Sequence, residues 1–172
     1  SIRIETPRKA GEEIELFLQD APPYHNSCQA HIHNAVELLY VKEGSYTVYL
    51  DNMCYEINKG DLILFCSGAI HHVVTGGNAE NSYYVIKIPP LFFLEFAKRG
   101  AGEEYAMRFA LNRNENKCFW KAQELKGSEI KRVLDTLVSE FTQGKYASEV
   151  AIKLKIMELL LTILRYDPPS EQ

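Results

Sequence analysis

A series of short segments rich in β-branched and aromatic residues occupies positions 14 to 88 and limits the possible folds more than any other feature. Turn-forming residues separate these segments. The pair Asp51-Asn52 suits a two-residue hairpin, because both residue types tolerate positive φ. About seven or eight short strands at such spacing are typical of a β-sandwich or β-barrel. The segments span residues 14–18, 36–41, 46–50, 53–57, 62–65, 70–74 and 83–88.

Pro89-Pro90 ends this region, and the apolar residues then follow the period of a helix. Ser128 suits an N-cap, because its hydroxyl can accept a hydrogen bond from a free backbone N–H at a helix start. Residues 167–172 are polar and proline-bearing, which is typical of a linker. The expected helices lie at 91–98, at 103–111, between the cap at Ser128 and the stop at 143–145, and at 147–165.

The composition excludes several classes of function. The 172 residues suit one domain, or one domain with a small helical appendage, and the net charge is −4. Residues 1–89 hold 6 Lys+Arg against 11 Asp+Glu, and residues 90–172 hold 13 against 12, so neither half resembles a nucleic-acid-binding patch. No apolar run is long enough to span a membrane. The four cysteines form no CxxC pair, which indicates free thiols in a reducing compartment, and we expect a cytoplasmic protein.

The last expected helix carries two apolar stripes. One stripe has the 4, 3, 4, 3 spacing of a coiled-coil seam and comprises Val150, Leu154, Met157, Leu161 and Leu164. The other lies beside it and comprises Ile152, Ile156, Leu159 and Ile163. A helix that is apolar on two sides must be covered on two sides. We therefore predict that the first stripe is a homodimer interface; the alternative is a helix buried inside the core of one domain.

All five histidines fall within residues 25–72. His31 and His33 alternate along an expected strand and share one face, and Glu37 keeps that parity if the strand continues. His71 belongs to a later strand. Three imidazoles and one carboxylate that converge inside a barrel suit Fe, Mn, Ni or Zn and leave room for water or substrate.

Two motifs in this region resemble those of the cupins. The first is HIHNAVE at 31–37, followed after six residues by Gly44, and the second runs from Gly60 through CSG at 66–68 to His71. The first motif opens with His25 in place of Gly, and the second has Cys66 for Pro and Thr75 for Asn. These departures affect loop geometry more than ligation.

The wider stretch from 31 to 72 resembles the N-terminal effector-binding domain of AraC-family bacterial transcription regulators. The resemblance implies a mainly β fold, with a cupin-like barrel (a double-stranded β-helix or jelly roll) followed by a C-terminal helical subdomain. The implied domains are a barrel over 1–89, a helical dimerisation segment over 90–166, and the start of a linker over 167–172. The helix-turn-helix part that binds DNA in that family is then missing from this chain.

The same resemblance implies a non-enzymatic domain that binds a small-molecule effector, such as a sugar, forms a homodimer, and contacts DNA only through the missing part. His31, His33, Glu37 and His71 then either bind a divalent metal (Zn, Ni, Fe or Mn) or line a polar effector pocket without one. Two alternatives stay open. One is a stand-alone metal-dependent cupin enzyme, a dioxygenase or isomerase, which the full ligand set favours and the helical tail disfavours. The other is a dimerisation module with a vestigial pocket.

Overall fold

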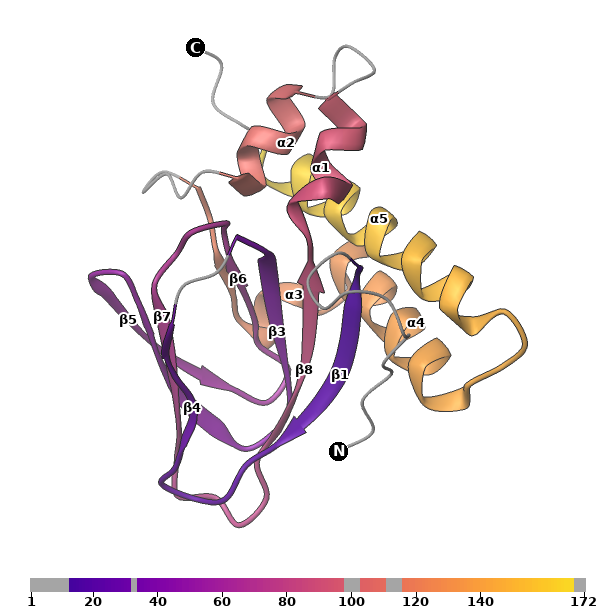
Figure 1. The fold of residues 1–172 in the computed structure, drawn as a ribbon. Helices are drawn as coiled ribbons and strands as arrows, with labels where there is room; N and C mark the ends of the chain where they lie inside the picture. Colours follow the sequence, from indigo (N-terminus) through magenta and orange to yellow (C-terminus); the bar gives the residue numbers. More distant parts are fainter. Residues whose placement is uncertain (1–12, 32–33, 98–102, 111–115, 169–172) are drawn as a thin grey trace. The chain divides into compact units, whose positions relative to one another are not determined.

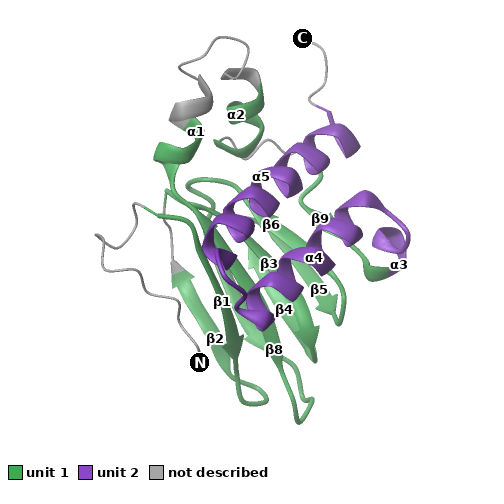
Figure 2. Cartoon of the chain, turned by 90° about the vertical axis from the view of Figure 1, so that its right-hand side faces the viewer, with its two compact units in different colours: residues 1–122 green, residues 123–172 purple. Residues whose placement is uncertain are grey.

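The computed structural model describes residues 13–31, 34–97, 103–110 and 116–168 (Figure 1). Two compact units divide the chain, residues 1–122 and residues 123–172, and each is described by itself (Figure 2). In chain order the elements are β1 (Glu15–Asp20), β2 (Asn26–His31), β3 (Val36–Glu43), β4 (Ser45–Leu50), β5 (Met53–Asn58), β6 (Leu62–Phe65), β7 (His71–Thr75), β8 (Ser82–Ile88), α1 (Pro90–Ala97), α2 (Glu103–Ala110), β9 (Phe119–Trp120), α3 (Ala122–Leu125), α4 (Glu129–Gln143) and α5 (Ser148–Tyr166).

Two antiparallel sheets build the first unit. One has the order β1-β8-β3-β6-β9 and the other the order β2-β7-β4-β5, and the two face each other as the walls of a barrel (Figure 1). Neighbouring strands that are far apart in sequence, such as β1 with β8 and β2 with β7, exclude a simple up-and-down meander. The predicted fold class is confirmed: a mainly β, cupin-like barrel followed by helices.

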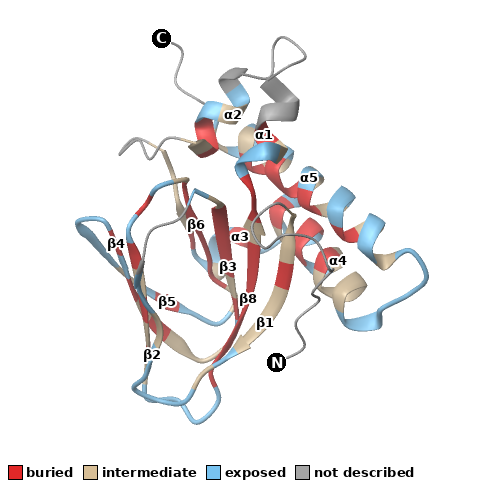
Figure 3. Cartoon of the chain, in the orientation of Figure 1, coloured by how far each residue is buried: buried red, intermediate tan, exposed pale blue. Residues whose placement is uncertain are grey.

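Strand alternation divides the residues of the first sheet between its two faces. On β3, Leu39 and Val41 point into the barrel, where they join a buried cluster with residues of β4, β5 and β7. Leu38, which points the other way, is equally buried, so β3 is covered on both faces (Figure 3). A strand buried on both faces reads as a nearly continuous apolar run, and this explains why VELLYV shows little alternation.

Two tight turns fix the register around β4. The predicted hairpin at Asp51-Asn52 is confirmed, since Leu50 pairs with Met53 and Asp51 has φ +49°. The turn before β4 uses Gly44, whose φ is +90°. A Cβ there would lie 2.3 Å from Oδ1 of Asn81, so the position requires glycine for both its φ and its space.

The condition for a shared parity is not met, because the strand that carries His31 does not continue to Glu37. β2 ends at His31, the chain bends at Asn34 and Ala35, and β3 begins at Val36 in the other sheet. The two residues therefore reach the interior from opposite walls, and parity along one strand does not relate them. The two-residue strand β9 and the short helix α3 were not expected, because segments so short carry no readable period.

The second unit is mainly the helix pair α4 and α5, which lie side by side (Figure 2). The predicted cap is confirmed: Oγ of Ser128 accepts a hydrogen bond from the backbone N–H of Lys131 at 3.2 Å. The predicted stop is also confirmed, because Gly144 ends α4 in the left-handed region with φ +56°. An ion pair of 2.7 Å between Arg132 and Glu158 joins the two helices. The domain bounds at 89 and 166 stay predictions.

No helix within the described ranges is both long and apolar enough to cross a membrane.

Candidate functional site

Glu37 is a carboxylate inside an apolar barrel. It lies near the start of β3, where the register places it directly opposite Lys87 on β8 and Phe65 on β6. Its side chain is only 5% exposed. A buried carboxylate is costly unless charge or hydrogen bonds compensate it, so its neighbours decide what this position can do.

His71 approaches Glu37 from the facing sheet. Its side chain is fully buried, and Nε2 lies 3.8 Å from Oε1 of Glu37. The imidazole stacks on the Phe65 ring at a centroid distance of 4.1 Å and an interplanar angle of 9°. Nδ1 lies 3.2 Å from the backbone oxygen of Ala69, a contact in which the ring nitrogen donates when it carries the proton. Stacking and this contact together hold the ring with Nε2 directed at the carboxylate.

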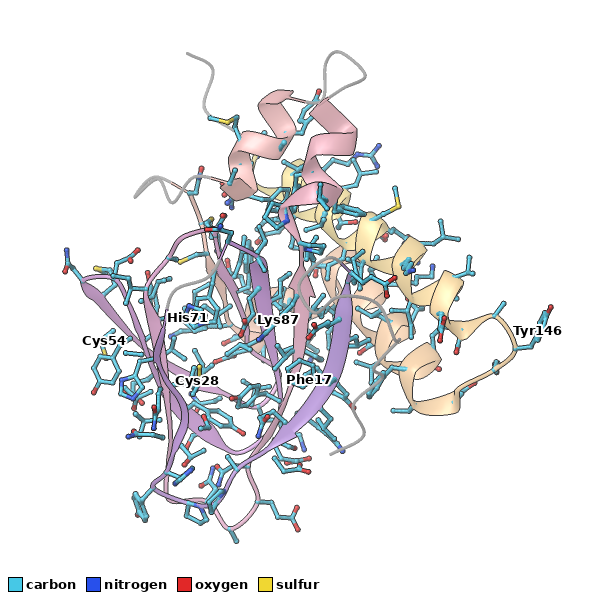
Figure 4. All side chains as sticks on the ribbon, in the orientation of Figure 1. Phe17, Cys28, Cys54, His71, Lys87 and Tyr146 are labelled. Atoms are coloured by element: carbon cyan, nitrogen blue, oxygen red, sulfur yellow. The ribbon has the colours of Figure 1, made fainter. Side chains whose placement is uncertain are left out.

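Lys87 completes the group, and sequence reasoning missed it. Its Nζ lies 3.7 Å from Oε2 of Glu37, on the side away from His71, and 5.8 Å from the centroid of the Phe17 ring. About a third of the side chain is exposed (33%), unlike those of Glu37 and His71. Figure 4 shows His71, Lys87, Phe17 and Cys28 within the barrel. One signal was available: Lys87 shares parity with the interior residues Tyr83 and Val85 in the strand SYYVIKI.

We call Glu37, His71 and Lys87 the polar layer. Two residues further along the same strands, the interior is aliphatic. Val85 pairs with Leu39, Leu39 pairs with Ile63, and on the facing sheet Val48 pairs with Val73. All five side chains are buried, and we call them the apolar layer. In the described part of the barrel, the three residues of the polar layer thus lie at one level, next to an aliphatic level.

The charges of the polar layer act on Cys28, a half-buried thiol of β2. Burial is the largest cause that raises the pKa of Cys28, to about 11; the negative charge of Glu37 raises it further, and the ammonium of Lys87 opposes both. Burial also raises the pKa of Tyr83, whose hydroxyl donates to Oγ of Ser27 at 3.3 Å. Both groups are therefore protonated at neutral pH and offer a weak thiol donor and a phenol to the interior.

The structure brings together two of the four predicted ligand residues. Glu37 and His71 lie side by side across the two sheets. The backbone of His31 is the register partner of His71, but its side chain and all of His33 lie outside the described residues. Within the ranges that the structure describes, no three His, Cys, Asp or Glu side chains are placed to hold a metal ion.

The position of Lys87 does not fit a divalent metal at Glu37. A metal-binding carboxylate donates its oxygens to the ion, and a cationic neighbour at 3.7 Å competes for the same charge. The spacing of Glu37 and His71, taken alone, would allow both to face one ion. Metal binding by the four residues thus stays a prediction, and the charge of Lys87 opposes it.

A separate surface pocket lies at the other end of the strands. Its volume is about 530 Å³, and it is lined by residues at the ends of β1 and β3, at the start of β8, and in the β1–β2 and β7–β8 connections. It contains neither Glu37 nor His71. It is lined by Asp20, Ala21, Pro22, Lys42, Glu43, Ala79, Glu80, Asn81 and Ser82.

Several solved structures are similar to part of this chain. A Photorhabdus luminescens protein shares 23% identity over 57% of this chain and 81% of its own, with a TM-score of 0.46. A cupin superfamily protein from Desulfitobacterium hafniense shares 10% over 51% and 76%, with a TM-score of 0.44. A mutant oxalate decarboxylase of Bacillus subtilis shares 20% over 44% of this chain, with a TM-score of 0.41, and the match spans only 21% of that enzyme.

Among curated proteins, no sequence matches this chain. One family does match, and it matches over nearly the whole described length. Residues 13–160 correspond to the family described as the AraC-like ligand binding domain, and this range takes in both sheets and most of the two long helices. The chain belongs to the family of AraC-like ligand-binding domains.

Proposed function

We propose that the barrel binds a small polar effector at the polar layer, as the sensing part of a transcription regulator. The observation that carries the proposal is the gathering of Glu37, His71 and Lys87 in an otherwise apolar interior, in a chain of a ligand-binding family. Buried charges weaken a fold unless they are well compensated, so such a group is expected where binding requires it. The polar layer offers acceptors at Glu37 and donors at Lys87.

A sugar or a related polar metabolite fits this set. Hydroxyl groups both donate and accept, so they can satisfy a carboxylate and an ammonium at once. Phe17, which is partly buried beside Lys87, offers apolar surface for the carbon face of such a ligand. The effector acts on regulation only if it binds one conformation better than another.

We further propose that α5 dimerises the chain through its outer stripe. Val150 is 59% exposed and Leu154 60%, whereas Ile156 on the other stripe is fully buried. Met157 and Leu161 are also exposed. The two stripes thus differ in exposure, and a second copy of the chain would cover the outer one. DNA contact would then require a further, DNA-binding part of the regulator.

The effector site is tested by ligand screening. Thermal unfolding is measured with a panel of sugars and polar metabolites, and each ligand that raises the melting temperature is titrated by calorimetry. We expect Glu37→Gln to weaken binding by about tenfold or more, because it removes a charged hydrogen-bond acceptor. Glu56→Gln, an exposed carboxylate on β5, is the matched control and should bind as the wild type does. Ligands that bind Glu37→Gln as tightly as the wild type would contradict the proposed effector site.

The dimer is tested by sedimentation. Leu154→Glu combined with Leu161→Glu should give a soluble monomer, because the charges would face each other across the seam. Tyr146→Glu is the control, since Tyr146 is fully exposed outside the stripe. A double variant that sediments as a dimer places the interface elsewhere, and an insoluble one indicates a helix buried within one subunit.

The enzyme alternative makes its own prediction. A metal-dependent cupin enzyme would retain metal when purified without chelators or nickel resin, and His33→Ala would abolish metal and turnover together. Metal-free protein that still binds an effector would support the sensing role.

A further inference from the structure

We infer that Lys87 is the built-in counter-ion of Glu37 and that it keeps divalent metals out of the barrel. The inference goes beyond effector binding, because it concerns what the same carboxylate rejects. It also stands independently of any effector, since metal binding can be measured on the free protein.

The fold itself fixes the position of Lys87. In the register of β3 and β8, Glu37 and Lys87 are direct cross-strand partners and point to the same face. On its other side β8 pairs Lys87 with Glu15 of β1, so the ammonium stands in a row between two acidic positions. Opposite charges directly across strands stabilise each other, which favours this arrangement over one in which the side chain turns away.

One further contact holds the ammonium near the carboxylate. It lies over the Phe17 ring at 5.8 Å, within the range of a cation–π interaction. Val85, two residues earlier on β8, is buried on the same face, so the interior beside Lys87 is apolar. An ion that took its place would have to separate Lys87 from both Glu37 and Phe17.

Electrostatics then determines which cation Glu37 can accept. A divalent ion bound at about 2 Å to Oε2 of Glu37, the oxygen that faces Lys87, would lie within about 6 Å of the Lys87 ammonium. The repulsion between a double and a single positive charge at that distance is strong where the surroundings are poor in water, and Glu37 and His71 are both buried. The ammonium of Lys87 also already compensates the negative charge of Glu37, so a metal ion would gain less binding free energy from the carboxylate.

The experiment titrates Co²⁺ into the purified protein and follows the visible absorption that cobalt gains from nitrogen and oxygen ligands. We expect weak binding by the wild type and binding tighter by about tenfold or more in Lys87→Met and Lys87→Gln, since both remove the charge. Lys87→Arg keeps the charge and should bind as weakly as the wild type. Glu37→Gln combined with Lys87→Met should lose the gain, because the carboxylate is the ligand.

The matched control is Lys59→Met, which breaks a surface ion pair with Glu43 (2.6 Å) and should leave cobalt binding unchanged. Circular dichroism checks that each variant folds. If Lys87→Met does not fold, Lys87→Gln replaces it in the comparison. Two results would overturn the inference: a wild type that binds Co²⁺ as tightly as Lys87→Met, or neutral variants that gain no affinity. Failure to find an effector would leave these results unaffected.

Discussion

The polar layer and the apolar layer are built from the same strands, two residues apart. On β3 Glu37 is followed by Leu39, and on β8 Lys87 follows Val85. On β7 His71 is followed by Val73. The pairing of β3 with β8 and of β4 with β7 continues unchanged through both layers, and the side chains along these strands differ.

The difference indicates that the two layers have different roles. Apolar side chains that pack at this density stabilise the barrel, whereas buried charges at best offset their own desolvation. A chain selected for stability alone would continue the apolar layer through the position of Glu37. The polar layer is therefore expected to serve binding, at some cost in stability.

The largest effect on stability should come from the apolar layer. Leu39 is 1% exposed, so Leu39→Ala leaves a cavity between the sheets. We expect the free energy of unfolding to fall by about 2–5 kcal/mol in denaturant titrations. The control Leu154→Ala removes the same atoms from an exposed position and should cost less than about 1 kcal/mol when the protein is monomeric. Equal losses of stability in Leu39→Ala and Leu154→Ala would contradict the view that the apolar layer stabilises the barrel.

A smaller loss is expected when one charge of the polar layer is removed. Lys87→Met leaves the buried carboxylate of Glu37 without the positive charge of the lysine. Because Lys87 is partly exposed, we expect a loss of only about 1–2 kcal/mol at neutral pH. Lys59→Met, at a surface pair, should change stability by less than about 0.5 kcal/mol. A Lys87→Met variant as stable as Lys59→Met would show that Glu37 does not depend on Lys87.

Removal of both charges should cost less than removal of one. The double variant Glu37→Met with Lys87→Met replaces the ion pair by apolar side chains of similar length. We expect its free energy of unfolding to lie within about 1 kcal/mol of the wild type, or above it. Thermal and denaturant unfolding measure this directly. A loss larger than the sum of the two single variants would mean that the polar layer is structural.

The smallest effect concerns the reactivity of Cys28. Glu37 raises the pKa of this thiol, so Glu37→Gln lowers it and increases the thiolate fraction at pH 8. We expect Cys28 to react with a disulfide reagent about threefold faster in Glu37→Gln and more slowly in Lys87→Met, because the lysine charge acts in the opposite direction. Cys54, exposed on β5, is an internal control whose rate should not change. Changes of the same sign in both variants would contradict the assigned charges.

Local signals in the sequence predict most of the fold. Turn residues and short segments rich in β-branched and aromatic residues identify β3 to β8, and Ser128 and Gly144 mark the ends of α4. The motif spacing also selects Glu37 and His71, which the fold brings together.

The rest depends on long-range pairing. The role of Lys87 follows from the register of β3 with β8, strands about fifty residues apart, and a single lysine near a strand end otherwise suggests a solvent-exposed position. Likewise, the change of sheet between His31 and Val36 is set by tertiary pairing, and a strand pattern on both sides of a short bend does not reveal it.

One measurement tests the central claim most directly. The Glu37→Met, Lys87→Met double variant is expected to keep the fold while it loses the polar layer, so it separates binding from stability. An effector found with the wild type is titrated calorimetrically into this variant and into Lys59→Met. The account predicts that the double variant loses measurable binding and that Lys59→Met retains the wild-type affinity. Equal affinity in all three proteins would contradict it and place the effector site elsewhere.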